Sequence, residues 1–335
     1  MTMPALAYRA ETGLRCWLSR LATHRGWTPA VLPYPSYGGH GRLRVLGRVL
    51  LAPASTDPAA RRGLPGWQRL LTLELPDVEV HVAVAGQEVT VRSDEAGLVD
   101  ATLDVSLAAG PVEATLTVGA RSATGLVHVA AESAETGVVC DIDDTVWVTG
   151  LHHPLRAAWR TLTRASGGRQ AVPGMSNLLG GLTAQQPGAP VVYLSNGPWN
   201  LAGPVTRFLE RTGFPTGALL MTDWGITPQA WFRDGKAHKR SSLERLAQDF
   251  PSVRWVLVGD DGEHDPELYA AFARQQPDRV AAIGLRHVTA SKGSTPAESV
   301  DAGGVPVVRA SSGDDLLDLL RPVLHEQDQR ARPPR

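Results

Sequence analysis

The feature that most constrains the fold of this chain is a short apolar run, Val138 to Cys140, that leads into two aspartates, Asp141 and Asp143. An apolar run of this length before a polar cluster indicates a buried parallel strand. The alternation of an extended chain directs both carboxylates the same way, out of the carboxyl end of that strand. In open α/β sheets, ligands bind at this end. Two neighbouring carboxylates repel each other, so the pair predicts catalysis or a bound cation.

After residue 135, apolar runs alternate with helix-like stretches. This pattern is typical of a parallel sheet with crossover helices, so we predict a Rossmann-like α/β domain over residues 135–324. The predicted strands are Val138–Cys140, Val191–Leu194, Trp255–Val258, Ala281–Leu285 and Val305–Val308, and the predicted helices are Leu201–Arg211, Ser241–Phe250 and Pro266–Gln275.

The residues before this region follow a different pattern. From Leu70 to Val129, valine and leucine alternate with polar residues, and turn-forming residues separate the short runs. That spacing predicts a small antiparallel β-sandwich. A helix is expected from about Ala10 to Arg25, and the stretch Pro33–His40, rich in Pro, Tyr, Ser and Gly, is expected to be a loop. We assign residues 1–134 to this first domain, and we predict a disordered polar tail over residues 325–335.

Polar groups follow several of the predicted parallel strands. Because the carboxyl ends of parallel strands meet at one edge of the sheet, these groups are expected to lie together. Each group alone is a weak signal, since aspartates and serines are common at strand ends and helix starts. The set consists of Asp141 and Asp143 after the first strand, Ser195 and Asn196 after the second, Lys236 and Lys239 before a helix, and Asp260, Asp261 and Asp265 after the third.

These residue types suit phosphoryl transfer. A hard cation such as Mg2+ takes about six oxygen ligands, commonly from carboxylates, phosphate and water. A carboxylate can also attack phosphorus and form an aspartyl-phosphate, while a second carboxyl group acts as general acid and base. Hydroxyl, amide and lysine donors would stabilise the charge that develops on the phosphoryl oxygens.

The same residues resemble a known superfamily. Asp141 to Thr145, Ser195, a lysine, and Gly259-Asp260 with Asp265 are similar to the four ordered motifs of the haloacid dehalogenase superfamily. Within it, the region from Gly137 to Val288 resembles the catalytic domain of the actin-patch type of Mg2+-dependent phosphatidate phosphatases. That closer resemblance rests on the segments Ser195 to Trp199, Asp223 to Gly225, His238-Lys239 and Leu257 to Glu267.

The resemblance implies a role for each matching residue. Asp141 would be the nucleophile and Asp143 the acid and base. Lys239 would neutralise the phosphoaspartate, with Lys236 as the alternative lysine. Asp261 ranks below Asp260 as a metal ligand. The residues implied to bind phosphate are Thr145, Ser195, Asn196 and Lys239, and those implied to hold Mg2+ are Asp141, the backbone carbonyl of Asp143, Asp260 and Asp265.

Composition limits the partners that the chain can have. The formal net charge is -1 over 335 residues, so no bulk attraction to nucleic acid is expected. The two cysteines are far apart and provide no disulfide or metal framework. The sequence has neither a run of 18 apolar residues nor a secretory leader, so we expect a cytoplasmic protein. A phosphatidate substrate would require transient contact with a membrane and a peripheral location.

Three hypotheses follow. The first is a Mg2+-dependent phosphatase that converts phosphatidate to diacylglycerol and phosphate through an aspartyl-phosphate. The second keeps this chemistry but takes soluble phosphoesters or phosphoproteins as substrates. The third is a non-catalytic adaptor that binds partners through the β-sandwich. The complete motif set argues against the adaptor, because an inactive site has no need for all of Asp141, Asp143, Lys239 and Asp260.

Overall fold

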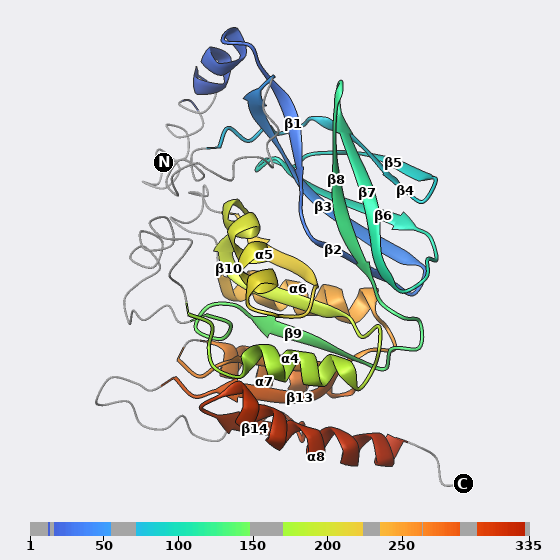
Figure 1. The fold of residues 1–335 in the computed structure, drawn as a ribbon, viewed down its shortest axis with the longest axis vertical. Helices are drawn as coiled ribbons and strands as arrows, with labels where there is room; N and C mark the ends of the chain where they lie inside the picture. The colour runs from blue at the N-terminus through green and yellow to red at the C-terminus, as the bar shows by residue number, and fades with distance from the viewer. Residues whose placement is uncertain are drawn as a thin grey trace.

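Two β-sheets, one mixed and one parallel, make up the framework of the protein (Figure 1). The structure is a computed structural model, and it describes residue 13 and residues 17–54, 72–147, 170–223, 235–262, 264–288 and 300–331. Residues 17–24 are helical, within the span where a helix was predicted. They are followed by the mixed sheet, and the parallel sheet comes after it in the sequence.

The mixed sheet has eight strands in the described residues: β1 (Trp27–Pro33), β2 (Ser36–Gly39), β3 (Arg42–Pro53), β4 (Glu79–Val84), β5 (Gln87–Arg92), β6 (Leu98–Asp104), β7 (Gly110–Val118) and β8 (Arg121–Val129). Their order is β1-β3-β2-β8-β7-β4-β5, and β6 also pairs with β3. Strands β5 and β6 contact each other, so the sheet curls around a core. The alternating Val80, Val82 and Val84 of β4 are buried in that core, as their period of two predicts.

This arrangement differs from the expected antiparallel sandwich. The strands form one sheet, and β2 pairs in parallel with β8 while the other pairs are antiparallel. Strand β2 lies in the stretch that was expected to be a loop. Its glycines allow close packing rather than a turn: a Cβ on Gly38 would lie 2.2 Å from Cδ2 of Leu43. Glycine in a strand marks such a close approach, which the sequence alone does not distinguish from loop flexibility.

The parallel sheet matches the predicted pattern of strands. It contains β9 (Thr136–Asp141), β10 (Val191–Pro198), β11 (Ala218–Thr222), β12 (Arg254–Asp260), β13 (Val280–Arg286) and β14 (Val307–Ala310), in the order β11-β10-β9-β12-β13-β14. The central strands β9, β10 and β12 are buried along nearly their whole length, as expected for a sheet covered on both faces. The chain runs outward from β9 in one direction and then returns to its other side, so the order reverses beside β9.

Helices cover both faces of the parallel sheet. They are α4 (Met175–Ala184), α5 (Ala202–Arg211), α6 (Gly235–Asp249), α7 (Asp265–Gln275) and α8 (Gly313–Ala331), with the short 3-10 helices η2 (Trp199–Leu201) and η3 (Pro277–Arg279). Helices α4 and α8 pack together on the face toward the viewer in Figure 1, and α6 packs against α7 behind the sheet. The predicted helices correspond to α5, α6 and α7, whereas α4, α8 and strand β11 were not predicted.

The expected disordered tail is wrong for residues 325–331, because α8 continues to Ala331. One face of α8 buries Leu316, Leu320 and Leu324 against the sheet. Polar residues that form helices readily can extend a helix anchored in this way. A hydrogen bond from Arg254 to Gln327 also fastens the last turns. Residues 332–335 lie outside the described residues.

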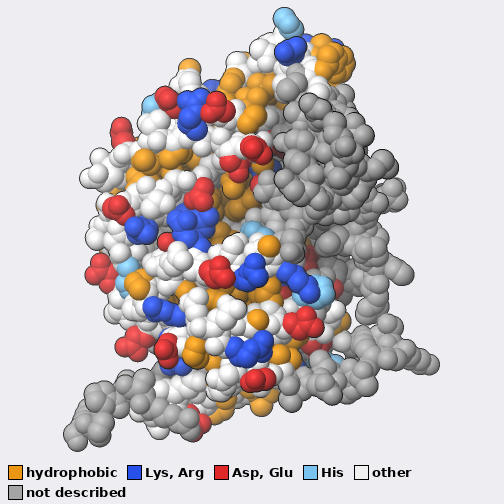
Figure 2. All heavy atoms as spheres, turned by 180° about the vertical axis from the view of Figure 1, so that it is seen from behind, with side chains coloured by type: hydrophobic (Ala, Val, Ile, Leu, Met, Phe, Trp, Pro, Cys, Tyr) orange, Lys and Arg blue, Asp and Glu red, His pale blue; other side chains and the backbone are white. Residues whose placement is uncertain are grey.

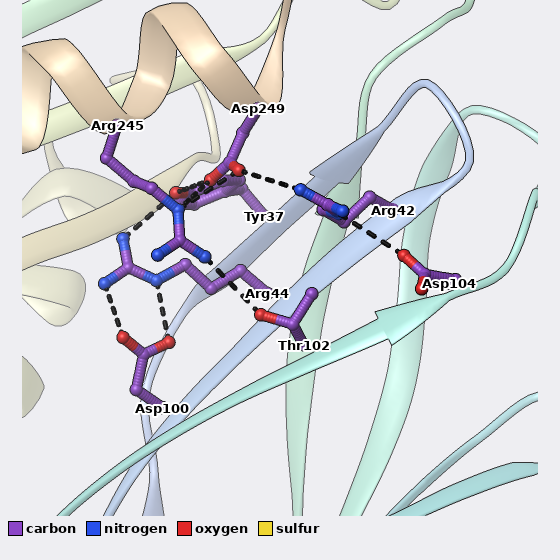
Figure 3. A network of polar contacts seen from close by, with 8 residues as sticks. All are labelled: Tyr37, Arg42, Arg44, Asp100, Thr102, Asp104, Arg245 and Asp249. Atoms are coloured by element: carbon purple, nitrogen blue, oxygen red, sulfur yellow. Dashed lines mark hydrogen bonds and ion pairs between the residues drawn. The ribbon is translucent and has the colours of Figure 1, made fainter.

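The two sheets contact each other through polar and apolar groups. At the end of α6, Asp249 accepts a hydrogen bond of 2.7 Å from the hydroxyl of Tyr37 in β2 (Figure 3). That hydroxyl accepts one of 3.0 Å from Arg44 of β3, which is paired with Asp100 of β6. Burial raises the pKa of Tyr37, with the Arg44 charge opposing the effect, so the phenol remains a donor at neutral pH. These contacts attach the end of α6 to the mixed sheet.

In the described part of the chain, no helix combines the length and the apolar character that are needed to cross a membrane. On the face shown in Figure 2, basic and acidic side chains are interspersed. This distribution agrees with the formal net charge of -1.

Candidate active site

The carboxyl end of β9 presents the two aspartates from which the functional predictions began. Asp141 is the last residue of β9 and is 2% exposed, and it pairs with Leu194 of β10 in the parallel ladder. Asp143 follows two residues later, beside the point where the strand order reverses. This is the position at which open α/β sheets bind ligands.

The backbone beyond Asp143 is held in an unusual conformation. Asp144 has a positive φ of 52°, which is uncommon for a residue other than glycine. The carbonyl oxygen of Asp144 accepts a hydrogen bond of 2.5 Å from Nη1 of Arg286, at the end of β13. The indole of Trp147 donates to Oδ1 of Asp143 over 3.3 Å. Arg286 and Trp147 therefore hold the turn that carries Asp143, and such strain is often found at functional sites.

Ser195 lies beside Asp143, as predicted from its place after the second strand. Its hydroxyl donates to Oδ2 of Asp143 over 3.0 Å and accepts a hydrogen bond of 2.9 Å from the backbone amide of Gly197. The carbonyl of Asn196 accepts a hydrogen bond of 2.9 Å from the hydroxyl of Thr222, at the end of β11. Ser195 lies in the irregular carboxyl-terminal part of β10, residues 195–198, which we call the Ser195 loop. These bonds attach the Ser195 loop to the segments at the ends of β9 and β11.

Lys239 provides the positive charge of the site. It lies in the second turn of α6, and its side chain is buried although it is charged. Its ammonium group contacts Oδ1 of Asp141 at 2.6 Å and Oδ1 of Asp265 at 2.5 Å. Lys236, the alternative lysine, is half exposed and lies 3.8 Å from Glu267. The structure therefore brings Lys239, and not Lys236, to the carboxylates.

Three buried carboxylates meet at this edge of the sheet. Asp141, Asp260 and Asp265 offer oxygens that all lie within 4.8 Å of one another. Asp265 opens α7 and is 1% exposed, and its Oδ2 has no hydrogen-bond partner among the described residues. Such buried oxygens fit a hard divalent cation, because oxygen is the donor that Mg2+ prefers and a cation would compensate the unpaired carboxylate oxygen.

Asp261 takes a different position from its neighbour Asp260. Its Oδ1 accepts a hydrogen bond of 2.8 Å from the amide of Val288, and its Oδ2 lies 2.6 Å from Nδ1 of His287. These contacts connect the ends of β12 and β13 and leave Asp261 outside the carboxylate cluster. The lower rank that the sequence analysis assigned to Asp261 agrees with this geometry.

Two of the predicted phosphate-binding residues have unsatisfied polar atoms. Thr145 Oγ1 and Asn196 Oδ1 are both buried, and neither has a hydrogen-bond partner in the part of the chain that the structure describes. Most buried polar atoms in proteins are hydrogen-bonded, so such atoms at a site are candidates for contact with a ligand. Of the longer resembling segments, Trp224, Gly225 and Glu263 lie outside the described residues.

Burial and charge together shift the pKa values of this cluster. Burial raises the pKa of the Asp141 carboxyl well above its ordinary value, and the adjacent Lys239 ammonium opposes that rise. Burial also raises the pKa of Asp143, against the hydrogen bonds from Trp147 and Ser195. Burial alone would lower the pKa of Lys239, but the carboxylates of Asp141 and Asp265 raise it well above normal. Lys239 is therefore fully charged at neutral pH.

Sequence reasoning overlooked several residues that shape the site. Trp147, Thr222 and Arg286 each hold a loop of the site, but aromatic and basic residues at such positions are common and carry no distinctive signal. Gly259 has a clearer signal in the sequence, because it directly precedes Asp260 in the resembling motif. A Cβ at Gly259 would lie 2.5 Å from Asp265 Oδ2 and 2.8 Å from the Tyr269 ring. The absence of a side chain there allows Asp265 to approach β12.

We expect Gly259→Ala to displace Asp265 and to weaken metal binding, because the added methyl group overlaps the Asp265 carboxylate. The expected result is about a tenfold or greater increase in the Mg2+ concentration needed for half-maximal stabilisation, a size typical of disturbed ligand support. Thermal unfolding at graded Mg2+ concentrations measures this shift. Gly180→Ala is the matched control, since nothing lies within 4 Å of a Cβ there. An unchanged Mg2+ requirement in Gly259→Ala would contradict the expected displacement.

Comparison with known proteins finds similarity in the second part of the chain. Residues 136–287 match the family model described as "Phosphatidate phosphatase APP1, catalytic domain". An uncharacterized protein of Schizosaccharomyces pombe is 30% identical over 152 residues, which are 45% of this chain and 25% of that protein. Phosphatidate phosphatase APP1 of Saccharomyces cerevisiae is 26% identical over 161 residues, which are 48% of this chain and 27% of that protein.

The matches to these two relatives therefore span only about a quarter of each relative's length. Among solved structures, a putative beta-phosphoglucomutase from Thermotoga maritima is 14% identical, with a TM-score of 0.36, over 56% of this chain and 100% of that one. A carbohydrate acetylesterase from Xanthomonas citri is 10% identical, with a TM-score of 0.31, over 89% of this chain and 76% of that one.

Proposed function

We propose that this chain, whose residues 136–287 match the family model of the phosphatidate phosphatase APP1 catalytic domain, is a phosphoric monoester hydrolase that acts on phosphatidate. The observation that carries the proposal is the buried cluster in which Lys239 contacts both Asp141 and Asp265. Asp143 and Ser195 adjoin it and are hydrogen-bonded to each other. The groups proposed as nucleophile, as acid and base, as hydroxyl donor and as cation thus meet at one edge of the parallel sheet. We also propose that the α/β domain is haloacid dehalogenase-like.

The first chemical step forms a phosphoenzyme. An oxygen of the Asp141 carboxylate attacks phosphorus, and the bond between phosphorus and the glycerol oxygen breaks. The leaving oxygen takes a proton from the Asp143 carboxyl group and departs as the hydroxyl of diacylglycerol. The hydrogen bond from Ser195 and the two flanking contacts of Lys239 orient these groups before the reaction.

The second step releases phosphate. The Asp143 carboxylate accepts a proton from water while the water oxygen attacks phosphorus. The bond between phosphorus and the Asp141 oxygen then breaks, which restores the Asp141 carboxylate and the protonated Asp143. During both steps, Ser195, Thr145, Asn196 and Lys239 would bind the phosphoryl oxygens, where negative charge is spread over three atoms.

Asp141, Asp260 and Asp265, whose oxygens lie together, would hold an Mg2+ ion with the carbonyl of Asp143. When bound, the ion would neutralise charge on the phosphoryl oxygens and orient the ester. Lys239 already contacts two of these carboxylates, so it supplies part of the positive charge that their burial requires.

Phosphate release from phosphatidate in mixed micelles, with Mg2+ and with EDTA, tests the proposal. We expect metal-dependent release by the wild type and a loss of about 100-fold or more in Asp143→Asn, because general acid and base catalysis contributes about this much. Asp144→Asn is the matched control, because it makes the same substitution at the adjacent residue. We expect the Asp144→Asn variant to keep most of the wild-type activity.

Other results would overturn parts of the proposal. Release from soluble phosphoesters, with none from phosphatidate micelles, would preserve the mechanism and discard the lipid substrate. Activity that persists in EDTA would remove the metal from the proposal. No release from any phosphoester would reject the hydrolase and would favour the adaptor.

A further inference from the structure

A buried arginine of the mixed sheet reaches the edge of the parallel sheet where the candidate site lies. Arg48 belongs to β3, and it is only 4% exposed. Arginine is rarely buried to this extent unless it is paired. None of the motifs that predicted the site includes Arg48, which precedes Asp141 by nearly a hundred residues.

The partners of Arg48 follow the carboxyl ends of two neighbouring strands. Its Nη2 forms an ion pair with Asp223, which comes directly after β11. Its Nη1 donates a hydrogen bond of 3.2 Å to Oδ1 of Asn200, in the 3-10 helix η2 that directly follows β10. Arg48 therefore connects the ends of β10 and β11, and it does so from the other sheet.

Both partners are connected to the loop that presents Ser195. Asn200 lies five residues after Ser195, and the intervening Trp199 stacks on Tyr34 of the β1–β2 connection at 4.5 Å between ring centres. Asp223 is next to Thr222, whose hydroxyl donates a hydrogen bond of 2.9 Å to the carbonyl of Asn196. The Ser195 loop is thus connected to Arg48 on two sides. Asn200 follows the loop and is bonded to Arg48, and Thr222, which holds the carbonyl of Asn196, adjoins the Arg48 partner Asp223.

The electrostatics favour a fixed position for Arg48. Its guanidinium pairs with Asp223, and its Nη1 lies 3.9 Å from Oε1 of Glu74. Two carboxylates therefore adjoin one cation. The side chains of Arg48 and Asp223 are 5% and 7% exposed, which leaves little room for water to replace either partner. A planar guanidinium can hold two partners in defined directions, whereas an ammonium cannot reproduce that arrangement.

We propose that Arg48 is a positioning residue for phosphoryl transfer: it holds the ends of β10 and β11 so that Ser195 and the amide of Gly197 keep the geometry observed beside Asp143. This inference rests on the proposed hydrolase function for its kinetic consequence. Its structural part, an ordered Ser195 loop that depends on Arg48, does not. It also gives the mixed sheet a role in the catalytic domain.

If Arg48 had a purely structural role, it would hold the two sheets together without influencing the position of the Ser195 loop. The contact between Tyr37 and Asp249 offers the comparison, because it joins the mixed sheet to the end of helix α6 (Figure 3). Lys239 lies near the other end of that helix. Tyr37→Phe removes that buried hydrogen bond and touches no group of the site. It is therefore the matched control for a weakened contact between the sheets.

The test must avoid simple unfolding. Arg48→Gln alone removes the cation from a buried ion pair with Asp223, which is strongly destabilising. The double variant Arg48→Gln/Asp223→Asn removes both charges, leaves the local net charge unchanged and keeps side chains of similar shape. Replacement of a complete buried ion pair is often nearly neutral for stability, so this variant is expected to fold. Urea unfolding of both variants and the control establishes this.

Two readouts then examine positioning. In the folded double variant, we expect kcat for phosphate release from phosphatidate to fall about 10- to 100-fold, because small misplacements of catalytic groups have effects of this size. Tyr37→Phe should stay within about threefold of wild type. Hydrogen exchange provides the second readout: the Gly197 amide, bonded to Ser195 Oγ at 2.9 Å, should exchange at least tenfold faster in the double variant, while Val139 in β9 is unchanged.

Each outcome supports or overturns the inference. A folded double variant with unchanged kcat and unchanged exchange at Gly197 would overturn it. An equal loss of activity in Tyr37→Phe would also overturn it, because any loosened contact between the sheets would then suffice. If the wild type releases no phosphate, the proposed function fails, and the exchange rate at Gly197 still decides whether Arg48 orders the loop.

Discussion

Asp141→Asn is expected to abolish phosphate release, with a loss in kcat of about 10^4-fold or more, as for removal of a catalytic nucleophile in other enzymes. An amide oxygen is a far weaker nucleophile than a carboxylate, so the phosphoenzyme cannot form. The change also removes one of the three carboxylates that surround the proposed metal position. Steady-state phosphate release at saturating phosphatidate and Mg2+ measures the effect.

Asp261→Asn is the matched control for this variant. It makes the same chemical change close by, but Asp261 is hydrogen-bonded to Val288 and adjoins His287, and it lies outside the carboxylate cluster. We expect it to retain most of the wild-type activity. Normal turnover by Asp141→Asn would reject the aspartyl-phosphate mechanism, and a complete loss in Asp261→Asn would show that the assignment of carboxylates is wrong.

Lys239→Met is expected to produce the largest change in stability together with loss of activity. The ammonium contacts Asp141 and Asp265 at 2.6 and 2.5 Å, and all three side chains are buried. Removal of the cation leaves uncompensated buried carboxylates, which typically lowers the free energy of unfolding by about 3–5 kcal/mol. Urea unfolding in EDTA measures this loss.

Added Mg2+ separates the role of Lys239 from general damage to the core. Because a divalent cation binds only the folded cluster, it should raise the stability of Lys239→Met more than that of the wild type. Activity should remain low in both conditions, since the phosphoryl oxygens lose a donor. Lys236→Met, on an exposed side chain of the same helix, should change neither quantity appreciably. Equal stability of Lys239→Met and wild type in EDTA would contradict the prediction.

The contrast between the two sheets explains how far sequence patterns reach. The valines of β4 alternate with a period of two, and the apolar runs of β9 and β12 end in aspartates. The pattern of neighbouring residues therefore sufficed to predict these three strands. Strand β2 was misread because its glycines suggest a turn, although the structure uses them for close packing on Leu43. Strand β11 and helix α4 are short, and short apolar runs are ambiguous between helix and strand.

The order of the motifs along the chain was enough to predict that several polar groups lie together at one edge of the sheet. Parallel strands bring their carboxyl ends to one edge, so Asp141, Ser195 and Asp260 had to meet once the sheet was parallel. The choice between Lys236 and Lys239 required the structure, because they lie three positions apart in α6 and only one side chain is directed to the carboxylate cluster. The place of Asp261, beside His287 instead of in the cluster, was likewise decided by its neighbours on β13.

The sequence by itself determined the local elements and the chemical groups at the strand ends, because both follow from the periodicity of side chains along a few neighbouring residues. Only the tertiary structure decided that Arg48 of the mixed sheet reaches Asn200 and Asp223. The reason is physical: burial of an arginine becomes favourable only when partners from distant parts of the chain satisfy its charge. No local pattern records that compensation, since it exists only after the two sheets have packed together.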